Sequence, residues 1–158
     1  MTNKKIQKIQ LIVLGTIAAA IARPVWSQTA LNFVPVTPCR VVNTLTISPP
    51  YISGGTSRSF PISGSCGIPS SAYAFSFNVA VVPHAGLGYL TVWPTGQGQP
   101  VVATLNSIDG RAKSDAAIIP AGAGGAVSVF ASNDTDVFWI LTAISSRPAL
   151  PARWLFSR

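Results

Sequence analysis

Residues 72–82, AYAFSFNVAVV, decide the fold class of this chain. Their bulky side chains alternate with small or polar ones, so that one face carries Tyr, Phe and Val and the other carries Ala, Ser and Asn. A period of two indicates a β-strand that packs one face on a core. The stretch therefore predicts a sheet that is covered on one side, as in a sandwich or a closed barrel.

The rest of the chain repeats this character in shorter segments. Runs rich in Val, Ile, Thr, Phe and Tyr are separated by turns, and the chain has 13 Gly and 13 Pro. Helices have no uninterrupted stretch in which to grow. The expected strands are 32–36, 40–47, 57–62, 72–82, 88–93, 102–107, 116–119, 126–131 and 137–143. We predict an all-β chain that folds as a single small β-sandwich, with a small β-barrel as the alternative.

The N-terminus has the features of an export signal. Lys4, Lys5 and Lys8 precede an apolar run at 11–22, and small residues that suit cleavage follow it. The run is shorter than the ~20 residues that span a bilayer, and an Arg-Pro pair ends it. We expect a cleaved signal peptide at 1–27, with an uncleaved membrane anchor as the alternative.

Beyond the signal peptide we expect a β-sandwich domain over 28–143 and a disordered basic tail over 144–158. No second segment is long and apolar enough to span a bilayer. The product is therefore predicted to be secreted or held at the cell surface, without a membrane span after cleavage.

The net charge of +7 does not predict a nucleic-acid partner. The excess of positive charge lies in the leader and in the last dozen residues. The basic residues between 28 and 137 are Arg40, Arg58, Arg111 and Lys113. Their charges balance those of the 4 aspartates of the chain. A neutral domain has no electrostatic surface for a phosphate backbone.

Cys39 and Cys66 are the only cysteines, and both lie in turn-like segments of a chain predicted to be exported. A disulfide is expected in an oxidising compartment, and it would stabilise the fold by about 3–4 kcal/mol. Two reduced thiols are the alternative. Two cysteines cannot form a zinc site, which needs four ligands.

Several motifs are shared with a known group of proteins. They include CRVV (39–42), GYLTVWP (88–94) and LNSIDGRAKSDAAIIPAG (105–122), within a match that covers nearly all of 33–137. In these motifs the chain resembles an uncharacterised secreted β-rich module that recurs in extracellular proteins of soil bacteria. The resemblance implies no particular activity.

The chain departs from that module in two places. After CRVV the module usually has Asp-Thr-Arg, whereas this chain has Asn43, Thr44 and Leu45. The module usually ends in a strand of the pattern I-D-I-N-G-Y-F, whereas residues 138–148 read FWILTAISSRP. One permitted coding of that segment, read from its third nucleotide, gives LDINGYFVAP.

This coincidence suggests a frameshift near residue 138, which would make 138–158 out-of-frame text. A divergent last strand with a natural tail is the alternative. The apolar run at 137–141 is expected to lack the alternation that points one face inward. An exposed apolar strand of this kind would favour aggregation.

His84 is the only histidine, and it lies in the loop PHAGLG. A Ser-His-Asp hydrolase would need it as the general base, but nothing in the sequence places a serine or an aspartate beside it. The chain also lacks a G-x-S-x-G motif before a helix. We predict that His84 caps backbone groups in a turn.

The carboxylates do not form an acid–base pair or a metal site in the sequence. All acidic residues are aspartates in turn-like segments, whereas a glycosidase needs two carboxyl groups at a set separation. The two aspartates of DGRAKSD (109–115) are expected to pair with Arg111 or Lys113. The two aspartates of NDTD (133–136) are too few to bind Ca²⁺. The glycine-rich GAGG (122–125) is predicted to be a hairpin turn. No metal and no cofactor are expected.

The best binding candidate is aromatic. In a strand over GYLTVWP, Tyr89, Thr91 and Trp93 project to one face, while Leu90 and Val92 project to the other. If the aliphatic side chains face the core, the aromatic ones form an exposed platform that could stack on a sugar ring. If the aromatic side chains face the core, which is the commoner arrangement, the platform is lost.

We therefore expect a secreted, non-catalytic interaction or structural module that binds extracellular or cell-envelope polysaccharide through Tyr89, Thr91 and Trp93. A secreted hydrolase that uses His84 is the first alternative. A decayed gene product without function is the second, and it follows from the frameshift hypothesis.

Overall fold

The computed structural model describes residues 30–148, so the predicted signal peptide and residues 149–158 of the expected tail lie outside the described residues. The strands are β1 Asn32–Asn43, β2 Thr56–Pro61, β3 Ala74–Pro83, β4 Leu87–Pro94, β5 Leu105–Ser107, β6 Lys113–Pro120, β7 Ala126–Ala131 and β8 Thr135–Ser146. Two short 3-10 turns are η1 Ser65–Gly67 and η2 Ala123–Gly125. The described residues contain no helix long and apolar enough to cross a membrane.

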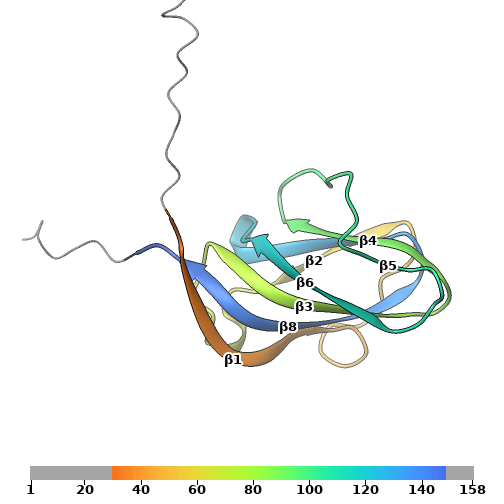
Figure 1. Cartoon of the computed structure of the whole chain (residues 1–158), viewed down its shortest axis with the longest axis horizontal. Helices are drawn as coiled ribbons and strands as arrows, with labels where there is room; N and C mark the ends of the chain where they lie inside the picture. The colour runs from red at the N-terminus through yellow and green to blue at the C-terminus, as the bar shows by residue number, and fades with distance from the viewer. Residues whose placement is uncertain (1–29, 149–158) are drawn as a thin grey trace, which may run out of the picture.

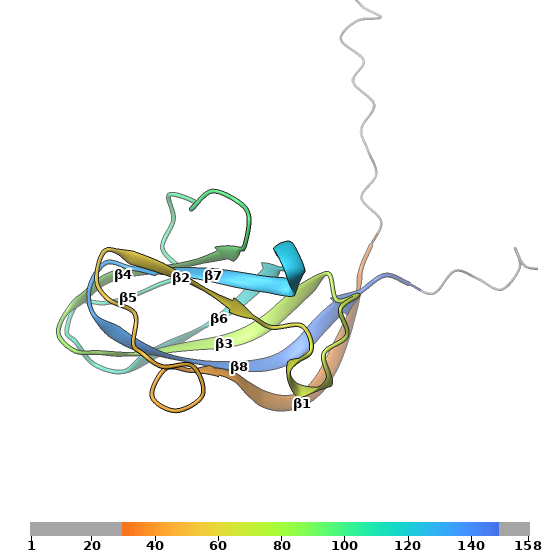
Figure 2. The ribbon, with the colours of Figure 1, turned by 180° about the vertical axis from the view of Figure 1, so that it is seen from behind.

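The strands form two four-stranded sheets, in the orders β1-β8-β3-β6 and β2-β7-β4-β5, with antiparallel pairing throughout. The sheets lie face to face as two layers (Figures 1 and 2). They remain two separate sheets, so the predicted β-sandwich is confirmed and the alternative barrel does not form.

Most connections carry the chain from one sheet to the other, and among consecutive strands only β4 and β5 pair with each other. The glycine-rich loop at 122–125 joins β6 of the first sheet to β7 of the second. The hairpin predicted there is therefore wrong, because a hairpin turn joins two strands that pair with each other. The loop crosses the edge of the sandwich instead.

Three expected strands differ in extent. The expected strands 32–36 and 40–47 merge into one long edge strand, β1, which ends at Asn43, so that residues 44–47 form a turn. The pairing of β1 with β8 shifts register between Pro35 and Cys39. Proline cannot donate a hydrogen bond to the ladder. It is therefore tolerated in an edge strand such as β1, which has a neighbour on one side only. The expected strand at 102–107 shortens to β5, since the preceding residues belong to a loop that lies against β4.

The core lies between the sheets and confirms the face predicted for 72–82. In β3, Phe75, Val79 and Val81 are 0% exposed and Phe77 is 1% exposed. Tyr73 is 40% exposed, because it precedes the first residue of β3. The inward residues of β3 therefore supply the central part of one wall of the core.

The strand β8 lies between β1 and β3. It includes residues 138–146, which belong to the segment that the frameshift hypothesis treats as out of frame. Val137, Trp139, Leu141 and Ala143 are all 0% exposed, whereas the intervening residues are only partly buried. The expectation that this segment lacks inward alternation is wrong. Val137, Trp139 and Leu141 point into the core, as the pleat of a strand requires. After a register shift in the pairing with β3, Ile144 rather than Ala143 belongs to the core.

Trp139 is the largest fully buried side chain, and it connects the two sheets. Its ring meets Phe60 of β2 at 5.5 Å between centroids and Phe77 of β3 at 5.6 Å. The Nε1 of Trp139 has no hydrogen-bond partner among the described residues. An unpaired buried N–H costs about 1–3 kcal/mol, so Trp139 contributes through packing.

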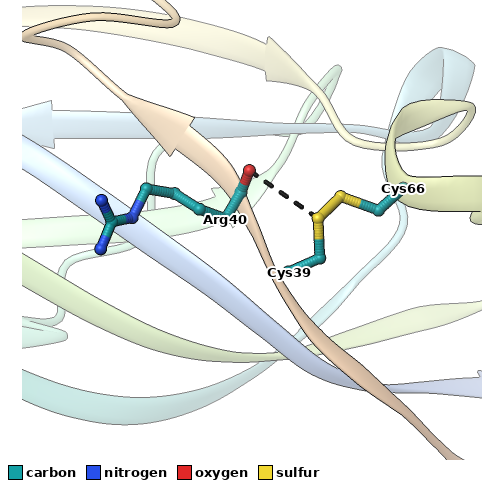
Figure 3. The surroundings of a disulfide bond; sticks show 3 residues. All are labelled: Cys39, Arg40 and Cys66. Atoms are coloured by element: carbon teal, nitrogen blue, oxygen red, sulfur yellow. Dashed lines mark hydrogen bonds between the residues drawn. A yellow bond between two sulfur atoms is a disulfide. The ribbon is translucent and has the colours of Figure 1, made fainter.

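The disulfide predicted between Cys39 and Cys66 is present, with Cα atoms 6.4 Å apart (Figure 3). It fastens the edge strand β1 to the turn η1 in the loop between β2 and β3. Gly64 and Gly67 flank Cys66 with φ of 87° and 73°, a conformation that glycine adopts without strain. The sequence SGSCG thus allows the tight turn that presents Cys66 to β1.

Replacing Trp139 by alanine should lower the free energy of unfolding by about 3–5 kcal/mol, because the change opens a large cavity at the contact between the sheets. Urea unfolding followed by intrinsic fluorescence measures this loss. Phe138→Ala is the matched control, since Phe138 points to the other face of β8 and is only partly buried. Equal losses in the two variants would contradict the central role of Trp139.

Replacing both cysteines by serine should lower the free energy of unfolding by about 3–4 kcal/mol, because the bond closes a loop over a sequence separation of 27. Thermal unfolding with and without reductant checks this. The reduced parent protein and the double variant should then melt at similar temperatures. A parent protein whose melting is insensitive to reductant would refute the prediction.

Candidate functional site

The outer face of β4 holds the predicted binding residues. Leu90 and Val92 point into the core and are 0% and 5% exposed. Because successive side chains of a strand point to opposite faces, Tyr89, Thr91 and Trp93 point outward from the sandwich. An aromatic platform required that the aliphatic residues of this strand face the core, and they do.

A loop at 95–104 covers part of this outer face, and it stands off the sandwich above β4 (Figure 1). The Thr91 hydroxyl donates to the carbonyl of Val102 at 2.6 Å, and Trp93 Nε1 donates to the carbonyl of Gln97 at 3.0 Å. Thr91 is 0% exposed and Trp93 is 7% exposed. These two residues hold the loop, so the open platform expected from the sequence is reduced to Tyr89.

Tyr89 remains 38% exposed at the surface. Its ring stacks on Phe130 of β7, with centroids 5.4 Å apart and an interplanar angle of 29°. The Tyr89 amide also donates to the Ser132 hydroxyl at 2.9 Å. Phe130 therefore covers one face of the Tyr89 ring.

Tyr89 also lines an open pocket of about 640 Å³. The residues that line it are Tyr89, Gln99, Pro100, Val101, Val102, Ala103 and Asn106. Aliphatic side chains and two amides thus surround one aromatic ring, a composition typical of sites for small ligands. The loop residues of this pocket were not predicted from the sequence, because the apolar run at 102–107 indicated a strand.

The same sheet also carries a row of hydroxyl groups outside the pocket. The hydroxyls of Ser59 and Ser128 lie 2.8 Å apart, and that of Ser128 lies 2.9 Å from the hydroxyl of Thr95. Ser59 is exposed at the edge strand β2. The outer face of the sheet β2-β7-β4-β5 therefore carries the exposed Ser59 hydroxyl, whereas Ser128 is buried and Thr95 is partly buried.

A second pocket, of about 480 Å³, is lined by residues 70–73, Ala121 and three glycines of the 122–125 loop. Tyr73 lies under the guanidinium of Arg147, whose Cζ is 4.7 Å from the ring centroid. This pocket thus has a tyrosine of similar exposure to Tyr89 but a cationic neighbour.

His84 does have an aspartate beside it, contrary to the sequence analysis. Its Nε2 lies 2.9 Å from Oδ2 of Asp136, which follows it by 52 residues. The other carboxylate oxygen of Asp136 accepts a hydrogen bond from the Thr44 hydroxyl at 2.6 Å. The pairing of β3 with β8 brings the two residues together, because it places Pro83 opposite Thr135.

This arrangement joins three segments. Thr44 follows β1, and its hydroxyl also accepts from the amide of Val137 at 3.0 Å. Asp136 and Thr44 are buried, whereas the His84 side chain is 41% exposed. The ring of Tyr51 lies against His84, with centroids 4.6 Å apart. The contacts fasten the loop after β1 to β8.

The His84 site lacks the further parts of a hydrolase. Among residues 30–148, no serine or cysteine side chain hydrogen-bonds the imidazole of His84. Neither of the two pockets described above includes His84. A serine hydrolase needs a nucleophile on the imidazole and an adjoining space for the acyl group.

The remaining carboxylates have protein partners. Asp109 accepts from Lys113 at 2.9 Å, and this hydrogen bond is the main cause that lowers the pKa of Asp109 below its ordinary value. Asp134 accepts from the amide of Gly54 at 2.7 Å, and Asp115 accepts from the amide of Ala116 at 2.8 Å. No three His, Cys, Asp or Glu residues in the described part of the chain cluster as metal ligands.

Asp136→Ala should lower the free energy of unfolding by about 1–3 kcal/mol, because it leaves the buried Thr44 hydroxyl without its acceptor. His84→Ala should cost less than about 1 kcal/mol, since the His84 side chain is 41% exposed and ion pairs with an exposed partner contribute little. Urea unfolding at neutral pH gives both values. A larger loss in His84→Ala than in Asp136→Ala would show that the imidazole, rather than Thr44, is the important partner.

No model of a known protein family matches the chain, and no curated protein sequence matches it. The proposed relation to the secreted soil-bacterial module therefore rests on the shared motifs, and the function has to be argued from the site.

Proposed function

We propose that this chain is a secreted, non-catalytic extracellular module that binds polysaccharide in the pocket beside Tyr89. The observation that carries the proposal is a half-exposed tyrosine, stacked on Phe130, at an open pocket of about 640 Å³. Aromatic rings held rigidly at a surface bind the apolar faces of sugar rings. Thr91 and Trp93 support the site through the loop that they hold.

Export is part of the proposal and has separate support. The disulfide between Cys39 and Cys66 is compatible with an oxidising compartment, as is the basic, apolar N-terminal sequence. A module outside the cell meets extracellular or cell-envelope polysaccharide directly. The sandwich would hold the pocket in place for binding, a role that requires no catalytic group.

The hydrolase alternative has less support. His84 and Asp136 form a pair, but the second oxygen of Asp136 is held by Thr44 and the site lacks a nucleophile among the described residues. A decayed product is also less well supported, because residues 138–146 contribute buried side chains to the core. We therefore favour binding over catalysis.

Tyr89→Ala should weaken polysaccharide binding about tenfold, because it removes the ring on which a sugar stacks. Affinity gel electrophoresis with soluble plant and bacterial polysaccharides, together with sedimentation on cellulose and chitin, measures binding. A thermal melt of each variant confirms that it is folded.

Tyr73→Ala is the matched control, because Tyr73 is 40% exposed and Tyr89 is 38% exposed, but they line different pockets. The control should bind like the parent protein. Binding that depends on Tyr73 and not on Tyr89 would refute the proposed site. Absence of binding to every polysaccharide would refute the proposed function.

A further inference from the structure

The lining of the Tyr89 pocket carries no formal charge. Its residues are one tyrosine, four aliphatic residues and the amides Gln99 and Asn106. The nearest charged segment in sequence, at 109–115, carries two cations and two carboxylates, none of which lines the pocket. Within it Lys113 pairs with Asp109 at 2.9 Å. An anionic ligand would enter this pocket without a cation to replace its hydration.

The polar groups of the pocket suit hydroxyl ligands. Asn106 Nδ2 donates to the carbonyl of Gly88 at 2.6 Å, and this bond leaves its Oδ1 as an acceptor. The amide of Gln99 can both donate and accept, as can the hydroxyl of Tyr89. Hydroxyl groups can also donate and accept, whereas carboxylates and phosphates only accept. The acceptor on Asn106 thus favours a ligand that donates.

The apolar groups define how such a ligand lies. Phe130 covers one face of Tyr89 and fixes the ring, so the ring does not need to be ordered when a ligand binds. Val101 and Val102 are 103% and 60% exposed at the wall of the same pocket. A sugar whose hydroxyls are equatorial offers a flat face of C–H groups to such surfaces and directs its hydroxyls outward to the amides.

We propose that the Tyr89 pocket selects uncharged polysaccharides, with a neutral pyranose against Tyr89 and its hydroxyls on Asn106 and Gln99. This inference rests on the proposed function, and it adds the class of ligand. Acidic polymers, such as those of uronic acids, are excluded from the pocket because no cation lines it.

The test compares two soluble probes, the neutral polymer xyloglucan and the anionic polymer polygalacturonate, by affinity electrophoresis and calorimetry in 20 mM and 500 mM NaCl. The protein should bind xyloglucan with an affinity that changes less than about twofold between the two salt concentrations, because only charged contacts are screened. Tyr89→Ala should reduce this affinity about tenfold.

Val101→Lys and Val101→Glu form a matched pair at a fully exposed position, so both variants should remain folded. A neutral ligand should bind the two variants with affinities within about twofold of each other. An anionic ligand would instead bind Val101→Lys about tenfold more tightly than Val101→Glu, since their charges differ by two.

The outcomes separate the two proposals. Salt-sensitive binding of polygalacturonate that is lost in Tyr89→Ala would overturn the neutral class but leave polysaccharide binding at this pocket intact. Binding of neither probe would overturn the choice of ligand. Binding of either probe that Tyr89→Ala does not weaken would overturn the proposed site as well.

Discussion

The contact between Trp139 and Phe60 bridges the two sheets at 5.5 Å, and the rest of the structure depends on the layer of apolar side chains to which it belongs. Trp139 comes from β8, which also pairs with β1 and β3, so one strand determines both the hydrogen bonding of its sheet and the packing on the other. The indole N–H has no partner among the described residues. The apolar area that Trp139 buries offsets that cost.

The candidate site follows from this packing. Because the core takes Leu90 and Val92, the intervening residues of β4 must face outward. Thr91 and Trp93 hydrogen-bond to the 95–104 loop and are covered by it, whereas Tyr89 stays partly exposed. The loop forms the wall of a pocket, and an outward-facing strand alone would have formed only a flat surface.

The C-terminal segment shows why a pattern of apolar residues does not decide the burial of a strand. A run such as FWIL places apolar residues on both faces of a strand. If such a strand lay at the edge of a sheet, part of its apolar surface would be exposed to water. At an interior position the same run is paired on both sides, and its outward residues are only partly buried. The frameshift therefore remains a hypothesis about the gene, while the written residues form a strand that contributes to the core.

Local features determined much of this protein. The alternation in 72–82 predicted the buried face of β3, and the cysteines predicted the disulfide. GYLTVWP predicted only that Tyr89, Thr91 and Trp93 share one face of β4 and left open which face is outward. Each prediction depends on the pleat of one strand or on a chemical preference of one residue type. Only the tertiary structure placed Asp136 beside His84, 52 residues away, and covered Trp93 with a loop. These contacts depend on strand pairing and on loop paths, which arise from the packing of the two sheets rather than from any single segment.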